Sequence, residues 1–280
     1  MRISWLAPKD LGELVRLGQS EGWLMDAAEL EHMRVRFPTL FFGAYDGKFL
    51  VGAISGYFHE KSGWIGNFIV KPELRKQGIG RRLFETLLKA MQEERPYLML
   101  HAEPGMAPFY EKYGFVKTRE VQRLERKPAP TTFRFTPQQA RALEDARFHG
   151  VMESLDHEFF RENRMTYLLE DLSHKSSLML ATANGMLHSK VVGSKHVFIG
   201  PFLVREGAYM DAERLLRGLL FYRGMKQIVC DVPAGMADMG SLYHHYDFED
   251  KSRTVQMVRG ENPHLVYEGI YAFASSGVCG

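Results

Sequence analysis

The segment Arg75-Lys76-Gln77-Gly78-Ile79-Gly80-Arg81-Arg82 decides how this sequence is interpreted, because it joins two different patterns. Before it, GWIGNFIV (63–70) is an apolar and aromatic run typical of a buried strand, and it ends at Lys71-Pro72. After it, apolar residues recur at the spacing of one helix face: Leu83, Leu87, Leu88 and Met91. Residues 75–82 are therefore predicted to lead from a strand into the first turn of a helix.

The two glycines of this segment, Gly78 and Gly80, leave its backbone free of side-chain bulk. The first turn of a helix has unpaired N–H groups, so an anionic group such as a pyrophosphate can approach and accept hydrogen bonds there. The spacing is neither the P-loop, which continues into Gly-Lys-Ser/Thr, nor the GxGxxG motif of dinucleotide binding. These patterns argue against a nucleoside triphosphate or NAD as the ligand.

The surrounding elements predict a mixed α/β unit. A helix is expected from the capping residue Asp26, and Asp46-Gly47 separates two apolar runs in the manner of a tight β-hairpin. The segment YLMLHA (97–102) predicts a short strand, MAPFYEKY (106–113) a short helix, and residues 115–124 a final strand.

A duplication is indicated in the second half. The 280 residues suggest about two domains, and the proline-containing segment 127–131 is typical of a stiff linker. We therefore expect domains at 1–128 and 129–280, and the order of predicted elements repeats after this boundary. The segments MAPFYEKYGF (106–115) and MGSLYHHYDF (239–248) share Met, both Tyr and Phe in register, which favours two copies of one fold.

The strand ending at Val70, the Arg-x-x-Gly-x-Gly loop and the downstream Phe109-Tyr110-x-x-x-Gly114-Phe115 together resemble the hallmark motifs of the GCN5-related N-acetyltransferases (GNAT). The resemblance covers about residues 40–120. It implies an α/β fold of two tandem GNAT-like domains, each with a mostly antiparallel twisted sheet and helices on both faces. The second copy resembles the trailing domain of tandem acetyltransferases that have lost the coenzyme site.

The same resemblance implies acetyl-CoA as cosubstrate. Its pyrophosphate would lie on the amides of the glycine loop, its pantetheine arm along the preceding strand, and a backbone N–H at Ile69 or Val70 would polarise the thioester carbonyl. The residues implied in coenzyme binding are Phe68, Ile69, Val70, Arg75, Lys76, Gln77, Gly78, Ile79, Gly80 and Arg81. Tyr110 matches the tyrosine that protonates the coenzyme sulfur in the family.

The sequence offers several candidates for the general base. Asn67 stands where many members of the family carry an acidic residue, and an amide can orient a water molecule but cannot accept a proton at neutral pH. Glu103 is the predicted second catalytic residue, or else it contacts pantetheine where relatives have asparagine. His101 is a neighbouring candidate, and His59 and Glu60 at the hairpin end are alternatives. No residue spacing predicts a metal site.

The second copy departs from the first at the glycine loop, where Met210 and Asp211 bring bulk and negative charge. Both oppose a pyrophosphate, so this copy is not expected to bind acetyl-CoA. Its tyrosine, Tyr243, keeps the register of the repeat, whereas Asp247 replaces a glycine. We expect this half to close the acceptor side, with aromatic candidates for its lining: Tyr267, Tyr271 and Phe273.

Composition excludes several classes of protein. The 36 basic and 34 acidic residues give a formal charge of +2, which favours neither nucleic acid nor an anionic membrane as partner. The two cysteines, Cys230 and Cys279, cannot form a disulfide framework, and neither an export signal nor a run of 18 apolar residues is found. A cytoplasmic monomer or homodimer is expected.

The sequence thus predicts an N-acetyltransferase in which a primary amine, on a small molecule or a peptide, attacks acetyl-CoA directly in a ternary complex. The alternative is a non-catalytic acyl-CoA-binding regulatory module, which the amide side chain of Asn67 keeps open. A peptidyl transferase using aminoacyl-tRNA predicts a strongly basic groove, and the composition does not indicate one.

Overall fold

The computed structural model describes residues 1–91, 95–144, 148–193 and 195–275. Cys279 lies outside these residues. The first half contains β1 (Arg2–Trp5), α1 (Leu11–Ser20), α2 (Ala27–Arg36), β2 (Phe41–Asp46), β3 (Phe49–Phe58), β4 (Ser62–Val70), α3 (Ile79–Met91), β5 (Tyr97–Ala102), α4 (Ala107–Glu111) and β6 (Val116–Arg126). The second half contains α5 (Pro137–Leu143), α6 (Phe148–Phe160), α7 (Met165–Leu172), β7 (Leu178–Ala181), β8 (Gly185–Val192), β9 (His196–Val204), α8 (Tyr209–Arg223), β10 (Gln227–Pro233), α9 (Ala237–His245), β11 (Glu249–Gly260) and β12 (Ile270–Ala272).

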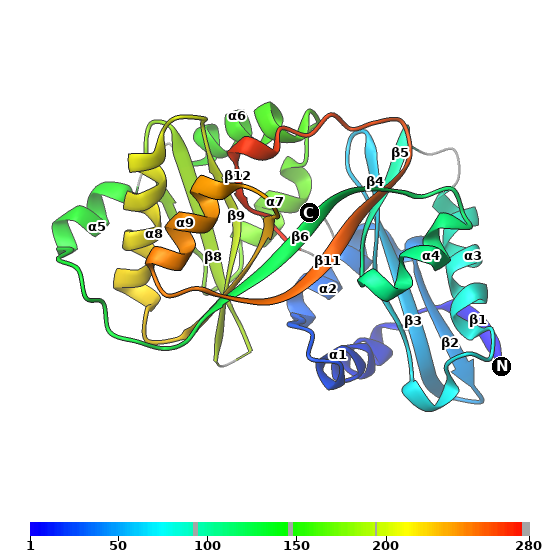
Figure 1. Ribbon diagram of the computed structural model, residues 1–280. Helices are drawn as coiled ribbons and strands as arrows, with labels where there is room; N and C mark the ends of the chain where they lie inside the picture. The colour runs from blue at the N-terminus through cyan, green and yellow to red at the C-terminus, as the bar shows by residue number, and fades with distance from the viewer. Residues whose placement is uncertain (92–94, 145–147, 194, 276–280) are drawn as a thin grey trace.

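The strands form one continuous mixed sheet in the order β1-β2-β3-β4-β5-β11-β6-β10-β9-β8-β7, with β12 paired to β9 (Figure 1). Most neighbours are antiparallel, and the parallel pairs are β4–β5 and β9–β10. The expected mixed α/β class with a mostly antiparallel sheet is therefore confirmed. The hairpin predicted at Asp46-Gly47 is present as β2–β3, with Gly47 at a φ of +57° that favours glycine.

The two copies exchange their last long strands. β11 from the second half lies between β5 and β6, pairing Met257 with Leu100 and Thr254 with Val121. β6 from the first half also pairs with β10, for example Arg126 with Ile228. Figure 1 shows β6 and β11 running side by side through the middle of the molecule, where each completes the sheet of both halves.

The repeat expected from the sequence is visible in the elements that precede these strands. Helix α4 precedes β6 and helix α9 precedes β11, and their matching tyrosines Tyr110 and Tyr243 are both buried. The turns that follow have the same left-handed backbone, with a φ of +83° at Gly114 and +63° at Asp247. Aspartate tolerates this conformation better than most residues, so the loss of the glycine leaves the turn intact.

The three largest apolar clusters among the described residues hold the sheet and helices together. One fills the face where α1, α2, α6 and α7 lie, and it contains residues of both halves such as Leu14 and Phe159. A second packs α3 and α4 on the opposite face of the first copy, and a third packs α8 and α9 in the second copy. The helix face predicted after the glycine loop is present, with Leu83, Leu87 and Met91 buried.

The exchange of β6 and β11 predicts that the two halves do not fold separately. The domain boundary near residue 129 stays a prediction. A chain of residues 1–128 would leave the inner edges of β5 and β6 unpaired, because β11 hydrogen-bonds to both. We expect this chain to lack a cooperative thermal transition, and coexpression with residues 129–280 to restore one. Cooperative melting of the isolated half at the temperature of the whole protein would contradict this expectation.

Candidate functional site

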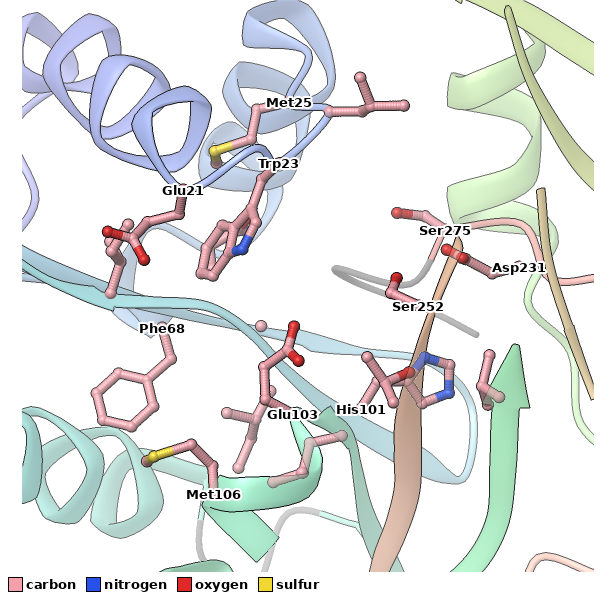
Figure 2. Close-up of a pocket in the computed structure, with 18 of the residues that line it drawn as sticks. Glu21, Trp23, Met25, Phe68, His101, Glu103, Met106, Asp231, Ser252 and Ser275 are labelled. Carbon is pink, nitrogen blue, oxygen red and sulfur yellow. The ribbon is translucent and has the colours of Figure 1, made fainter. Parts of the chain in front are cut away.

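A cavity of about 930 Å³ lies where the two halves meet, and strands of both halves line it. It begins where β4 and β5 separate: they pair at Ser62–Tyr97, Gly63–Leu98 and Trp64–Met99, and no further along their length. Beyond this point the two strand edges face an open space rather than each other, and residues from Ile65 onward in β4 line it (Figure 2).

A bulge in β4 shapes this edge. In the pairing of β3 with β4, Ala53 lies opposite Ile69 but Ser55 lies opposite Gly66, so β4 carries an additional residue here. Asn67 takes a left-handed φ of +51°, and its side chain donates a hydrogen bond to Ser55 Oγ at 2.8 Å. The resemblance aligns Asn67 with a position where many members of the family carry an acidic residue. In the structure its Nδ2 donates to Ser55 of the neighbouring strand.

The glycine loop forms the end of the cavity at the start of α3. The backbone of Gly78 has a φ of +81°, and a Cβ added there would meet only Arg81 Nη2, at 4.0 Å. The first helical hydrogen bond at this end runs from Arg82 N to Gly78 O at 3.1 Å. Within the described residues, the backbone N–H groups of 77–81 donate no hydrogen bond, so this turn presents a set of unpaired donors.

Eight of the ten side chains or glycines predicted to contact a coenzyme line this cavity: Phe68, Ile69, Val70, Arg75, Lys76, Gly78, Gly80 and Arg81. Two do not. Ile79 is 4% exposed and packs in the core under α3, and Gln77 is exposed, with its amide donating to Glu73 O. Their side chains are therefore excluded from the cavity, because a helix start turns successive residues to different sides. Arg75 is held by Glu21, with 2.8 Å between Nη2 and Oε1.

Tyr110 lines the same cavity from α4 and is buried among aromatic rings, including Phe84 at 5.4 Å and Phe109 at 5.2 Å between centroids. Burial raises the pKa of its hydroxyl well above the ordinary value, and the charge of Glu103 adds to this effect. Within the described residues this hydroxyl makes no hydrogen bond. It is therefore a neutral donor that the fold leaves available to a bound molecule.

Glu103 and His101 flank the middle of the cavity, and Figure 2 shows Glu103 projecting between Trp23 and His101. The Nε2 of His101 lies 3.3 Å from Nε2 of Gln256. Because the amide nitrogen donates, this arrangement assigns the histidine proton to Nδ1, and that atom has no hydrogen-bond partner among the described residues. Burial, with a smaller effect of Arg123, lowers the pKa of His101 to about 4, although Asp231 opposes the shift.

The lowered pKa of His101 predicts acid sensitivity. The ordinary pKa of 6.5 is regained on unfolding, so below about pH 6.5 the unfolded chain binds a proton that the native protein does not. The contribution of neutral His101 to the free energy of unfolding is therefore complete above about pH 6.5 and is lost as the pH falls toward 4. Between pH 7 and 4.5 the free energy of unfolding of the wild type should fall by roughly 2 kcal/mol more than that of the variant His101→Gln.

Urea unfolding at several pH values measures this difference, with His32→Gln on the exposed face of α2 as control. Burial also lowers the pKa of His59 and of His188, so a smaller dependence on pH remains in the variant. An identical loss of stability in wild type and His101→Gln would contradict the assignment.

The far wall of the cavity comes from the exchanged strands and the second copy. Arg123 of β6 and Asp231 of β10 form a two-pronged ion pair with both distances at 2.8 Å. Lys190 of β8 is 3% exposed and binds Glu29 at 2.8 Å and also Asp171. Further lining residues are Ser252, Thr254, Ala274 and Ser275. Sequence reasoning missed these residues because the strand exchange and the packing of the second copy against the first bring them here.

Several expected residues lie elsewhere. Tyr267, Tyr271 and Phe273 were expected to line the acceptor side but do not line this cavity. Tyr271 and Phe273 are buried in the packing of β12, and their successors Ala274 and Ser275 reach the cavity instead. His59 and Glu60 were alternative bases, but they lie at the hairpin end outside the lining, where Glu60 accepts a hydrogen bond from the backbone of Asn163.

Over the described part of the chain, no group of three or more His, Cys, Asp or Glu side chains is placed to hold a metal ion. The same residues include no helix that is both long enough and apolar enough to span a membrane.

Separated parallel strands, a bulge and a glycine-rich helix start together form one site in the first half of the chain. Residues 15–127 match the family model described as "Acetyltransferase (GNAT) domain". The first half of the chain thus matches the GNAT domain, and the second half repeats its element order, which gives the chain the fold of a tandem GNAT protein. Acyl transfer from an acyl-CoA is the general activity of this family.

Solved structures with the same fold cover nearly the whole chain. A putative acetyltransferase from Pyrococcus horikoshii is 19% identical, with a TM-score of 0.79 over 99% of this chain and 95% of that one. A tandem GNAT protein from the clavulanic acid biosynthesis pathway is 14% identical, with a TM-score of 0.66 over 92% and 98%. A GCN5-related N-acetyltransferase from Sphaerobacter thermophilus is 15% identical, with a TM-score of 0.63 over 96% and 98%. At these low sequence identities the similarity shows a common fold. No curated protein matches the chain.

Proposed function

We propose that the protein transfers the acetyl group of acetyl-CoA to a primary amine, by direct attack in a ternary complex. The observation that carries this proposal is the row of unpaired amides at 77–81, which opens into the same cavity as the hydroxyl of Tyr110. Unpaired donors at a helix start suit the pyrophosphate of the coenzyme, and a buried neutral hydroxyl suits its sulfur.

The charges at the coenzyme end support this orientation. Lys76 and Arg81 line the cavity beside the unpaired amides, and within the described residues neither forms an ion pair. The pantetheine arm would follow the edge of β4 at Phe68–Val70, which the bulge frees from β5. A backbone N–H at Ile69 or Val70 would then polarise the thioester carbonyl.

In the proposed reaction the amine nitrogen forms a bond to the carbonyl carbon, and the bond between that carbon and sulfur breaks. The leaving thiolate takes the proton of the Tyr110 hydroxyl, whose raised pKa keeps it protonated until charge develops on sulfur. The second proton that the nitrogen loses as the amide forms restores this hydroxyl, directly or through water. The attacking ammonium group must lose a proton first. We assign this step to Glu103, directly or through water, because its exposed carboxylate projects into the cavity.

His101 is a weaker candidate for the base, because its Nε2 already lies 3.3 Å from the amide nitrogen of Gln256, whereas the carboxylate of Glu103 is exposed in the cavity. Asn67 serves the sheet rather than the proton transfer, since its amide donates to Ser55. Neither residue is therefore required to change protonation in this scheme.

The acceptor would enter from the wall built by β6, β10, β11 and the end of β12. Arg123 and Asp231 neutralise each other there, and Lys190 is matched by Glu29 and Asp171. Glu103 adds a negative charge that forms no ion pair within the described residues, so this half of the cavity favours a cationic amine. A small molecule or a peptide would meet this requirement.

A non-catalytic acyl-CoA-binding regulatory module is the second candidate, and the observation that favours it is the side chain of Asn67, which cannot act as a base. Thiol release from acetyl-CoA, measured over a panel of small amines, amino acids and peptide N-termini, separates the two. Turnover with at least one amine supports transfer. Tight binding of acetyl-CoA with no thiol release on any amine supports the regulatory module.

A further inference from the structure

The second copy repeats the strand separation that forms the cavity in the first. Strands β9 and β10 pair in parallel from His196–Gln227 to Ile199–Cys230 and then stop pairing, as β4 and β5 do. Beyond this point, 200–204 of β9 and 231–233 of β10 form the edges that correspond to the coenzyme end of the first copy. These edges are not left open.

Strand β12 occupies the space between them. It pairs with β9 at Ile270–Leu203 and Ala272–Phe202, and immediately after it the N–H of Phe273 donates to Asp231 O of β10 at 2.9 Å. One short segment thus bridges both edges with backbone hydrogen bonds. Its side chains are at most 5% exposed. Figure 1 shows this segment beside β9.

The groove is shaped around this strand. The hydroxyl of Tyr243, the counterpart of Tyr110 in the repeat, donates to the backbone oxygen of Tyr271 at 2.9 Å. The residue of β9 beneath the segment is Gly200, and a Cβ added there would lie 2.0 Å from Phe273 O. In the second copy the Tyr243 hydroxyl therefore donates to the protein's own backbone. In the first copy the equivalent hydroxyl, that of Tyr110, makes no hydrogen bond within the described residues.

The segment leads directly to the first copy's cavity. The ring of Phe273 contacts His101 of β5 with 5.4 Å between centroids, and the next two residues, Ala274 and Ser275, line the cavity. Its hydrogen bond to Asp231 O also fixes the backbone of a residue whose side chain pairs with Arg123 in the same wall. The two grooves are thereby connected through one strand.

We propose that β12 is a built-in occupant of the second copy's groove, in the place that corresponds to the coenzyme arm of the first copy. The chain therefore holds one acyl-CoA, and the groove of the second copy supports the acceptor wall instead of binding a second ligand. β12 is a positioning element for Ala274, Ser275 and Asp231. The acceptor part of this inference rests on the proposed function, whereas the occupancy of the groove does not.

Hydrogen exchange and coenzyme titration test the occupancy without any acceptor. We expect the amides of 270–273 to exchange slowly in the free protein and equally slowly with saturating acetyl-CoA, and calorimetry to give one acetyl-CoA per chain. Exchange at the rate of an unstructured peptide would overturn the proposal, as would a second acetyl-CoA. Absence of acetyl-CoA binding would overturn the proposed function alone, because slow exchange would still establish the occupant.

The variants Gly200→Ala and Tyr243→Phe test the positioning role. Alanine at 200 forces the backbone of Phe273 to move, whereas the control Gly240→Ala on α9 adds a Cβ into open space. With the amine that turns over best in the panel as probe, Gly200→Ala should raise its KM by about 10-fold or more, while kcat and the KM for acetyl-CoA stay within about 2-fold. Exchange of the 270–273 amides should accelerate in this variant.

Tyr243→Phe is the milder variant in case Gly200→Ala does not fold, since it removes one hydrogen bond and no bulk. Its 270–273 amides should exchange about 5-fold faster, and the amine KM should rise in the same direction. Faster exchange with an unchanged amine KM in the folded variants would overturn the positioning role. Unchanged exchange in both folded variants would overturn the occupancy itself.

Discussion

Gly78→Glu is expected to weaken acetyl-CoA binding by a factor of about 100 or more, the largest effect on coenzyme affinity of any single change considered. The glutamate carboxylate would stand beside the unpaired amides of 77–81 and repel the pyrophosphate. The backbone of the glutamate would also have to adopt the φ of +81° that glycine takes there. Calorimetric titration with acetyl-CoA measures the change.

The control is Gly207→Glu, because Gly207 has nearly the same backbone, with a φ of +79°, and equally open surroundings in the loop before α8. It carries the same strain and charge but lies in the second copy. We expect it to lower the melting temperature to a similar extent and to leave coenzyme affinity unchanged. Equal affinity losses in both variants would mean that strain, and not the site, explains the result.

Tyr110→Phe is expected to reduce kcat by roughly 100-fold while the affinity for acetyl-CoA stays within about 3-fold. The phenylalanine ring keeps the packing against Phe84 and Phe109, and only the proton donor for the leaving sulfur is lost. Steady-state thiol release with the best amine of the panel measures kcat. Calorimetry gives the coenzyme affinity independently.

Tyr113→Phe is the matched control for this variant, because Tyr113 follows the same helix but its hydroxyl binds Glu85 at 2.9 Å on the surface. Its kcat should remain that of the wild type. An undiminished rate in Tyr110→Phe would return Tyr110 to a purely structural role in the aromatic cluster.

The coenzyme end of the site could be predicted from the sequence because it depends on local order along the chain. The strand before Lys71, the glycines at 78 and 80 and the helix after them are consecutive, so their arrangement follows from short-range backbone geometry. The burial of Ile79 illustrates the limit of this reasoning. A motif predicts which residues form a turn, but the packing of the helix determines which of their side chains face the cavity.

The acceptor wall could not be predicted in the same way. The repeat between 106–115 and 239–248 indicated two similar folds, and each was expected to complete its own sheet. Instead β6 and β11 serve both sheets, and this brings Arg123 against Asp231 across 108 residues of sequence. Two copies of one fold have similar strand edges, so pairing within a copy and pairing between copies look alike in the sequence.

The amino-acid sequence by itself determined the kind of fold, its duplication and the turn suited to a pyrophosphate, because hydrophobic periodicity and glycine conformations act over a few residues. Tertiary structure alone decided which strands exchange, that β12 fills the second groove, and which polar groups of the second copy face the first. These features depend on contacts between segments that are distant in the chain. Their free energies are set by the final packing and not by any local pattern.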